Sequence, residues 1–123
     1  RAIRNGECRV IPYEDRDAEL REKVFGEKGI LQGIAEENTP ELLLEVSPSR
    51  LRDSLSTIAD IIEDLPEEKE LIQAMNIAGC KKSVYDIGLT EEIIPISLRL
   101  APYVRRRLSF LRVSKMLKME EEV

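Results

Sequence analysis

"LRDSLSTIADIIEDLPEEKELIQAMNIAGC", residues 51 to 80, carries the strongest folding signal in this chain. In its first half, apolar side chains recur at intervals of four, three, four and three residues, a spacing that places them on one face of an α-helix. They are Leu51, Leu55, Ile58, Ile62 and Leu65. Ser47 with Pro48, or Ser49, is expected to begin this helix, because serine caps backbone N–H groups and proline suits the first helical position. The first half therefore predicts an amphipathic helix.

The second half of the stretch predicts a further helix. Pro66 is expected at its first position, followed by Glu67, Glu68 and Glu70, where the helix dipole favours acidic side chains. Gly79 is expected to end it. The side chains expected to face inward are Leu71, Met75 and Ala78.

The rest of the chain also contains residues that typically begin and end helices. Helices are predicted over residues 15–25, with Gly26 as the terminating residue, and over residues 28–38, and shorter helical segments over 40–46 and 83–88. Thr90 is expected to cap an apolar helix at the centre of the fold, and Ser109 to begin the last helix, with Phe110, Val113 and Leu117 as its apolar stripe. The one β-like run, residues 8–13, is cut short by Pro12. The sequence therefore predicts an all-α fold, a single multi-helix bundle of about six helices that spans residues 1–123 as one domain.

The composition is that of an ordinary soluble helical protein. Hydrophobic residues make up 42% and charged residues 35% of the 123 residues, and the formal net charge is -5. A long uncharged apolar run is absent, which argues against a membrane-spanning helix. We expect a cytoplasmic protein. Because the chain begins at Arg1 rather than Met, we also expect it to be the C-terminal domain of a larger protein.

Residue usage narrows the chemistry that the chain can perform. The chain contains no histidine, which argues against histidine-based catalysis and against most zinc or iron sites. The two cysteines, Cys8 and Cys80, lie far apart and do not form a C-x-x-C pair, so two separate thiols are expected rather than a disulfide.

The end of the chain is unusually basic. Between Glu92 and Glu120 there is no acidic residue, whereas seven basic residues fall in this interval. They are Arg99, Arg105, Arg106, Arg107, Arg112, Lys115 and Lys118. Nucleic-acid binding is one interpretation, but the chain is acidic overall and has only 4% aromatic residues, so a solvated or salt-bridged helix face is favoured.

A specific packing follows for this segment. Tyr103, Val104, Leu108 and Leu111 are expected to point inward and Arg106 outward. Arg105 or Arg107 is expected to pair with acidic residues of neighbouring helices.

Three other groups of residues are candidate sites, and the sequence favours none of them. The spacing of Gly26, Gly29 and Gly33 matches no phosphate-binding loop and fits helix ends better. A reactive thiol at Cys80 is one interpretation, because Lys81 and Lys82 lie beside it, but no acid–base partner is near it in the sequence and a plain inter-helix loop is favoured. The carboxylates of Glu36, Glu37, Glu67, Glu68 and Glu70 lie where exposed helix acids normally lie. No catalytic, cofactor-binding or metal-binding residue is predicted.

Residues 65–112 resemble the last helices of sn-glycerol-1-phosphate dehydrogenases and their relatives in the iron-containing alcohol dehydrogenase, or dehydroquinate synthase-like, superfamily. In that family a helix ends at a glycine before a short loop, and a later helix runs into a stretch like "APYIRDRYTVLRL". The matching residues here are Gly79, Asp86, Gly88, Ala101, Pro102, Tyr103, Arg105, Arg107, Leu111 and Arg112, with Ile87 a conservative match. Leu108 stands where the family has Tyr, Arg106 where it often has Asp, and Ser109 where it has Thr.

The resemblance implies an all-helical C-terminal domain that packs on an N-terminal nucleotide-binding domain of the same chain. The parent protein would then be an NAD(P)-dependent and metal-dependent polyol or glycerol-1-phosphate dehydrogenase. The family holds its metal with one Asp and two His, so the complete ligand set cannot lie in this chain. The chain alone is therefore not expected to be catalytic, and no cofactor is expected to bind to it.

A second interpretation makes the chain a helical protein-interaction module or regulatory subunit without catalysis. Its support is the series of well-patterned helices without catalytic residues. Both interpretations predict an exposed apolar face, and association into homo-oligomers is left open. Nucleic acid and membrane are not expected partners.

Overall fold

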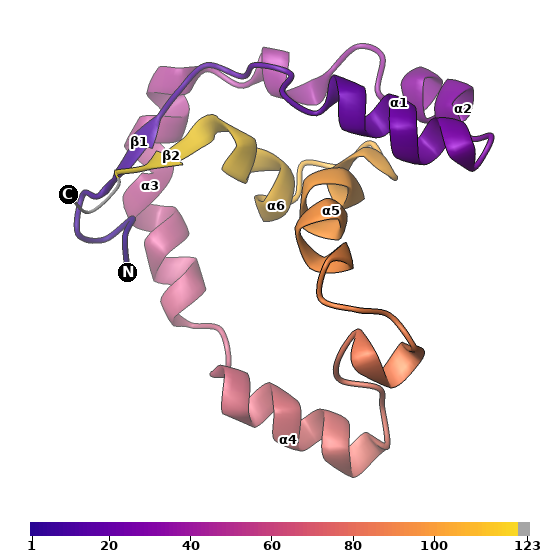
Figure 1. Cartoon of the computed structure of the whole chain (residues 1–123). Coiled ribbons are helices and arrows are strands. Elements are labelled where there is room, and N and C mark those ends of the chain that lie inside the picture. Colours follow the sequence, from indigo (N-terminus) through magenta and orange to yellow (C-terminus); the bar gives the residue numbers. More distant parts are fainter. Residues whose placement is uncertain (121–123) are drawn as a thin grey trace.

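The computed structural model describes residues 1–120, and helices dominate them (Figure 1). The six α-helices are α1 (Ala18–Glu27), α2 (Leu31–Glu37), α3 (Pro48–Glu63), α4 (Glu68–Ala78), α5 (Ile93–Leu100) and α6 (Phe110–Val113). Four 3-10 turns connect them: η1 (Leu42–Glu45), η2 (Tyr85–Ile87), η3 (Ala101–Tyr103) and η4 (Ser114–Met116). The predicted all-α class with about six helices is confirmed.

One short β-ribbon brings the two ends of the described chain together. Strand β1 (Cys8–Val10) pairs antiparallel with β2 (Leu117–Met119), in a register that sets Cys8 opposite Met119 and Val10 opposite Leu117. The expected helical stripe ending at Leu117 is therefore wrong. The backbone of this segment bonds to β1 instead, and α6 is a single turn.

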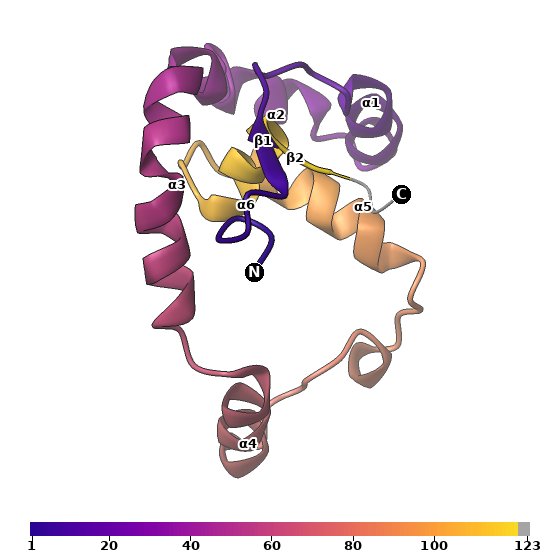
Figure 2. The same cartoon turned by 90° about the vertical axis from the view of Figure 1, so that its left-hand side faces the viewer.

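The helices follow one another around an open ring (Figure 2). The long helix α3 runs down one side, α4 and η2 form the far end, and α5 returns toward α6 and the ribbon. Helices α1 and α2 pack on each other beside the end of α5. In both views α4 stands apart from the other helices.

The buried core consists of two small clusters. The first joins Phe25 of α1, Ile34 of α2, Leu100 of α5 and Tyr103 of η3. The second contains the following residues: Leu43, Leu51 and Met116. Side chains from β1, α3, α6 and β2 pack around this second cluster.

Several predicted helix ends are confirmed. The hydroxyl of Ser47 accepts a hydrogen bond from the backbone N–H of Arg50 (3.4 Å) at the start of α3. Ser109 does the same for Arg112 (3.2 Å) at the start of α6. Gly79 ends α4 with φ +71°, a left-handed conformation that glycine adopts without strain.

Other predicted ends are wrong. Helix α4 begins at Glu68 with Glu67 as its cap, so Pro66 precedes the helix instead of opening it. Gly26 lies inside α1, and Gly29, with φ +71°, follows the end of that helix. Helix α5 begins at Ile93, after a turn at Thr90, whose side chain does not cap it.

The burial expected for α4 and for most of α5 is also wrong. Leu71 in α4 is 51% exposed and Leu98 in α5 is 54% exposed, and Ala78 is exposed as well. Helix α5 is thus not central. The physical reason is that α4 and most of α5 border the ring without a second layer of helices over them. Within residues 1–120, every helix is too short or too polar to cross a bilayer.

Candidate functional site

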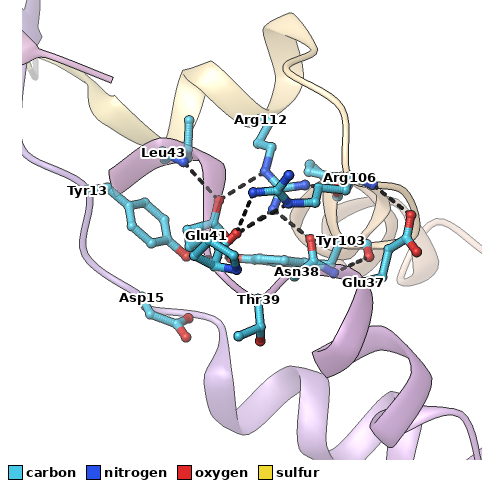
Figure 3. Close-up of polar contacts among 12 residues, drawn as sticks. Tyr13, Asp15, Glu37, Asn38, Thr39, Glu41, Leu43, Tyr103, Arg106 and Arg112 are labelled. Carbon is cyan, nitrogen blue, oxygen red and sulfur yellow. Dashed lines mark hydrogen bonds and ion pairs between the residues drawn. The ribbon is translucent and has the colours of Figure 1, made fainter. Parts of the chain in front are cut away.

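A polar cluster surrounds Arg112 of α6, whose side chain is completely buried (Figure 3). Its Nε donates to Oε1 of Glu41 (3.0 Å) and its Nη2 donates to Oε2 of the same carboxylate (2.9 Å). This is the two-pronged geometry that suits a guanidinium and a carboxylate. The pair fixes the basic tail, residues 99–118, against the segment that precedes η1.

The remaining donors of Arg112 are also used. Nη1 donates to the carbonyl oxygens of Pro102 (2.8 Å) and Arg105 (3.1 Å), and Nη2 donates to Oδ1 of Asn38 (2.6 Å). The guanidinium has five N–H groups, so its donor capacity is fully matched. Arg112 is therefore a structural residue that closes the turn after α5.

Tyr103 lies next to this pair and is 2% exposed. Its hydroxyl donates to Oδ2 of Asp17 (2.8 Å) and lies 3.3 Å from the hydroxyl of Tyr13. Three cations lie near its ring: the guanidinium carbons of Arg21 and Arg112 are 4.4 and 5.7 Å from the centroid, and Nζ of Lys115 is 4.8 Å from it. Burial, together with the bonds to Tyr13 and Asp17, raises the pKa of Tyr103 well above its ordinary value, so the phenol stays protonated at neutral pH.

Asp17 is the second buried charge. It accepts from Nε of Arg99 (2.8 Å) and from Nζ of Lys115 (2.6 Å), in addition to Tyr103. Burial acts to raise the pKa of Asp17, but the hydrogen bonds from Lys115, Arg99 and Tyr103 together outweigh it and hold the pKa below its ordinary value. Asp17 is thus an ionised anchor for two residues of the basic tail.

An open cleft of about 590 Å³ lies between η1, α1 and α2, with Tyr13, Asp15, Arg21, Thr39 and Glu41 among its polar lining residues. Asp15 and Arg21 form an ion pair across two hydrogen bonds, and the bond from Arg21 holds the pKa of Asp15 below its ordinary value. Each carboxylate among these five residues is therefore paired with an arginine, and none is poised to move a proton.

The side chains around the arginine triplet, residues 105–107, are less buried than expected. Val104 is 47% and Leu108 is 59% exposed, so only Tyr103 of the expected inward residues is fully buried, and Leu111 is half-buried. Arg106 is exposed, as predicted, and its guanidinium donates to the carbonyl oxygen of Pro40 (3.0 Å).

The expected ion pairs of Arg105 and Arg107 are also not found in the described part of the chain. Arg112 and Arg99 form these pairs instead, because the chain turns after η3 and carries the triplet outward.

The cysteines and glutamates that the sequence offers as candidates do not converge on a site. Cys80 is exposed beside the end of α4, and Cys8 is buried in β1, so the two thiols are separate, as predicted. The five weighed glutamates lie on the surfaces of α2 and α4. Glu67 and Glu70 form the capping box of α4. Across residues 1–120, no three His, Cys, Asp or Glu side chains are grouped to hold a metal ion, so these residues do not fit the metal implied by the resemblance.

Several of the residues that carry the family resemblance are buried or end a helical turn in this chain. Pro102, Tyr103 and Arg112 are buried, and Gly88 ends η2 with φ +79°. The carboxylate of Asp86 accepts the backbone N–H of Lys82 (3.0 Å), which lowers its pKa. The charge pattern groups Arg112 with the solvated cations, and the resemblance alone sets Arg112 apart, whereas Tyr103 is also predicted to point inward.

A further uncovered surface lies along α4, η2 and α5. We call residues 71–98 the apolar arm, because large apolar side chains of α4, η2 and α5 are exposed along it. They are Leu71, Ile72, Ile77, Tyr85, Ile87, Leu89, Ile94 and Leu98. Ile77 is 81% exposed, and such a surface in a folded chain marks a contact with another protein surface.

Comparison of the chain with protein-family models, curated proteins and solved structures gives no match.

Proposed function

We propose that this chain is a helical docking domain, not catalytic by itself, that covers a second domain through its apolar arm. More specifically, we propose the C-terminal domain of an NAD(P)-dependent and metal-dependent polyol or glycerol-1-phosphate dehydrogenase-like oxidoreductase. The second domain would then be the nucleotide-binding domain of the same protein.

The observation that supports docking is the amount of exposed surface. A compact monomer of 14.1 kDa exposes roughly 6,700 Å². The chain exposes 9387 Å², so roughly 2,700 Å² is in excess of a compact fold. Much of the exposed apolar area lies on α4, η2 and α5, where no second layer of helices covers it. A domain that folds against another one leaves this kind of surface when viewed alone.

The choice of partner rests on the resemblance of residues 65–112. The resemblance implies that catalysis, NAD(P) and the divalent metal belong to the parent protein, with most of the chemistry outside this chain. The absence of histidine from the sequence and the pairing of the buried carboxylates favour a structural role for these helices.

A binding experiment tests the proposal. The chain is mixed with the separately expressed nucleotide-binding domain of the parent protein, and binding is measured by calorimetry. Leu98→Glu, on the arm, should weaken binding at least tenfold, because it places a charge in an apolar contact. Leu44→Glu is the matched control, since Leu44 is 70% exposed but lies in η1, outside the arm. Equal binding by both variants and the unchanged chain would remove the arm as the docking surface.

The alternative, an interaction module or regulatory subunit, uses the same exposed arm but takes a separate protein as its partner. The two proposals differ in one observation. A parent reading frame without a nucleotide-binding domain and without a metal-binding Asp and His set would favour the interaction module.

A further inference from the structure

The excess surface is larger than one domain contact requires. Contacts between domains of one chain bury about 600–1,500 Å², counted over both sides. The excess of roughly 2,700 Å² lies on this chain alone, so docking through the apolar arm leaves a substantial part of it uncovered. A stable dimer needs about 600–1,000 Å² from each partner, which the remaining surface can supply.

Two exposed patches outside the arm have opposite charges. The acidic corner, residues 61–70, joins the end of α3 to the start of α4 and exposes Ile61 (59%) and Leu65 (60%). Its charged residues are Glu63, Asp64, Glu67, Glu68, Lys69 and Glu70. Glu63 is paired with Arg4, so the other four acids and one lysine leave a net charge of -3.

The basic patch, residues 104–110, lies between η3 and the first turn of α6. Its exposed apolar residues are Val104 (47%), Leu108 (59%) and Phe110 (50%). Arg105, Arg106 and Arg107 lie among them. The carboxylate of Glu37 in α2 accepts the backbone N–H of Arg106 (3.3 Å), so the patch together with this acid has a net charge of +2. Each patch thus combines apolar area with a charge that matches the other.

The two patches do not meet within one copy. The end of α3 and the segment between α5 and α6 lie apart in both Figure 1 and Figure 2. Ion pairs between the patches are absent among the contacts of residues 1–120. The partner that offers each patch its complement is a second copy of the same chain.

We propose that this chain forms a homodimer in which the acidic corner of each copy binds the basic patch of the other. The arrangement is reciprocal, as a two-fold axis requires, so both patches of both copies are covered and the assembly closes at two. Apolar side chains supply the contact area, and the opposite charges select the orientation. This proposal is independent of the apolar arm and of the identity of the docked domain.

Two charge-reversed variants test the dimer. The first carries Arg105→Glu and Arg107→Glu, and leaves Arg106 in place because Arg106 bonds to Pro40. The second carries Asp64→Lys and Glu68→Lys, and leaves the capping box of Glu67 and Glu70 intact. Each variant alone sets like charges against each other at both contacts and should dimerise at least about tenfold more weakly than the unchanged chain.

The mixture of the two variants is the decisive measurement. In a mixed pair, the acidic corner of the first variant meets the basic patch of the second, and the reversed patches also attract. The mixture should therefore regain a mass of twice 14.1 kDa in light scattering. A misfolded variant could not be rescued in this way. The control, Lys23→Glu with Lys28→Glu, has the same change in net charge as the first variant, on the exposed surface at α1, and should dimerise like the unchanged chain.

Salt provides a second readout. Raising the ionic strength from about 0.1 M to about 1 M shortens the screening length from about 10 Å to about 3 Å, so dimerisation should weaken. A chain that stays monomeric over a dilution series, a mixture that fails to regain the dimer, or a control as weak as the two variants would overturn the proposal. Loss of docking in the Leu98→Glu experiment would leave it untouched.

Discussion

Arg112 and Glu41 form a two-pronged ion pair 71 residues apart in the sequence, with the arginine completely buried and the carboxylate only 14% exposed. The pair joins the turn after α5 to the segment before η1. Because Arg112 also binds the carbonyl oxygens of Pro102 and Arg105, it sets the path of the basic tail.

Replacing Arg112 by methionine should cost about 3–5 kcal/mol in the free energy of unfolding, because it leaves Glu41 buried without its cation. Urea denaturation measures this cost. Arg52→Met on the exposed surface of α3 is the control and should change stability by no more than about 0.5 kcal/mol. The double change Arg112→Met with Glu41→Leu should cost less than the single change, and a larger, additive cost would contradict the pairing.

Adjacent leucines in η1 give a test of the core. Leu43 is 1% exposed and packs with Leu51 and Met116, whereas Leu44 is 70% exposed. Leu43→Ala should cost about 2–5 kcal/mol, as expected for a cavity in a packed cluster, and Leu44→Ala should stay within about 0.5 kcal/mol. Similar costs at both positions, measured by thermal or urea unfolding, would show that the second core cluster is misplaced.

Stability should fall in acid because of Asp17. The pKa of Asp17 is lower in the folded chain than its ordinary value of 3.8, so the folded state binds its proton less readily than the unfolded state. Its contribution is therefore present above about pH 4 and is lost as the pH falls through the folded pKa. Unfolding measured from neutral pH downward should show a shallower acid dependence for Asp17→Asn than for the unchanged chain. An unchanged slope would mean that Lys115 and Arg99 do not hold an ionised Asp17.

Tyr103 should have the opposite effect at high pH. Its pKa is raised by burial and by Tyr13 and Asp17, so its stabilising contribution is present below the unfolded pKa of about 10 and is lost as the pH rises above it. Tyr103→Phe keeps the ring beneath Arg21 and Lys115 but removes the hydroxyl, and should cost about 0.5–1.5 kcal/mol at neutral pH. Its unfolding free energy should also decline less steeply in alkali. Ultraviolet titration that shows the same late ionisation step with and without Tyr103 would contradict this assignment.

The two thiols should react at different rates. Cys80 is exposed after α4, whereas Cys8 is buried in β1 and burial raises its pKa. A thiol reagent under native conditions should therefore label one cysteine rapidly and the second only as the ribbon opens. Cys80→Ser should remove the fast phase, and Cys8→Ser the slow one. Two fast phases would show that the ribbon does not protect Cys8.

The features that the sequence determined by itself are local. The 3.6-residue period of Leu51, Leu55 and Ile58 predicts α3, because a helix that buries one face needs that spacing whatever it packs against. Ser47 and Ser109 cap their helices through bonds that span three residues, and the left-handed conformations at Gly79 and Gly88 depend on the missing side chain. These signals depend on neighbours in the chain, so the helical class and several helix ends could be predicted.

The position of each charged or apolar residue was decided only by the tertiary structure. Nothing in the local sequence separates Arg112 from the exposed arginines before it. It is buried because Glu41, Asn38 and two carbonyl oxygens converge on it. Leu117 joins a strand because Val10 lies opposite it, at the other end of the chain. The apolar residues of α4 and α5 have a periodicity that suits burial, yet several of them, Leu71, Ile77 and Leu98 among them, are exposed. A sequence pattern shows which face of a helix is suited to contact, whereas burial requires a partner surface, and within residues 1–120 no other helix supplies one over the apolar arm.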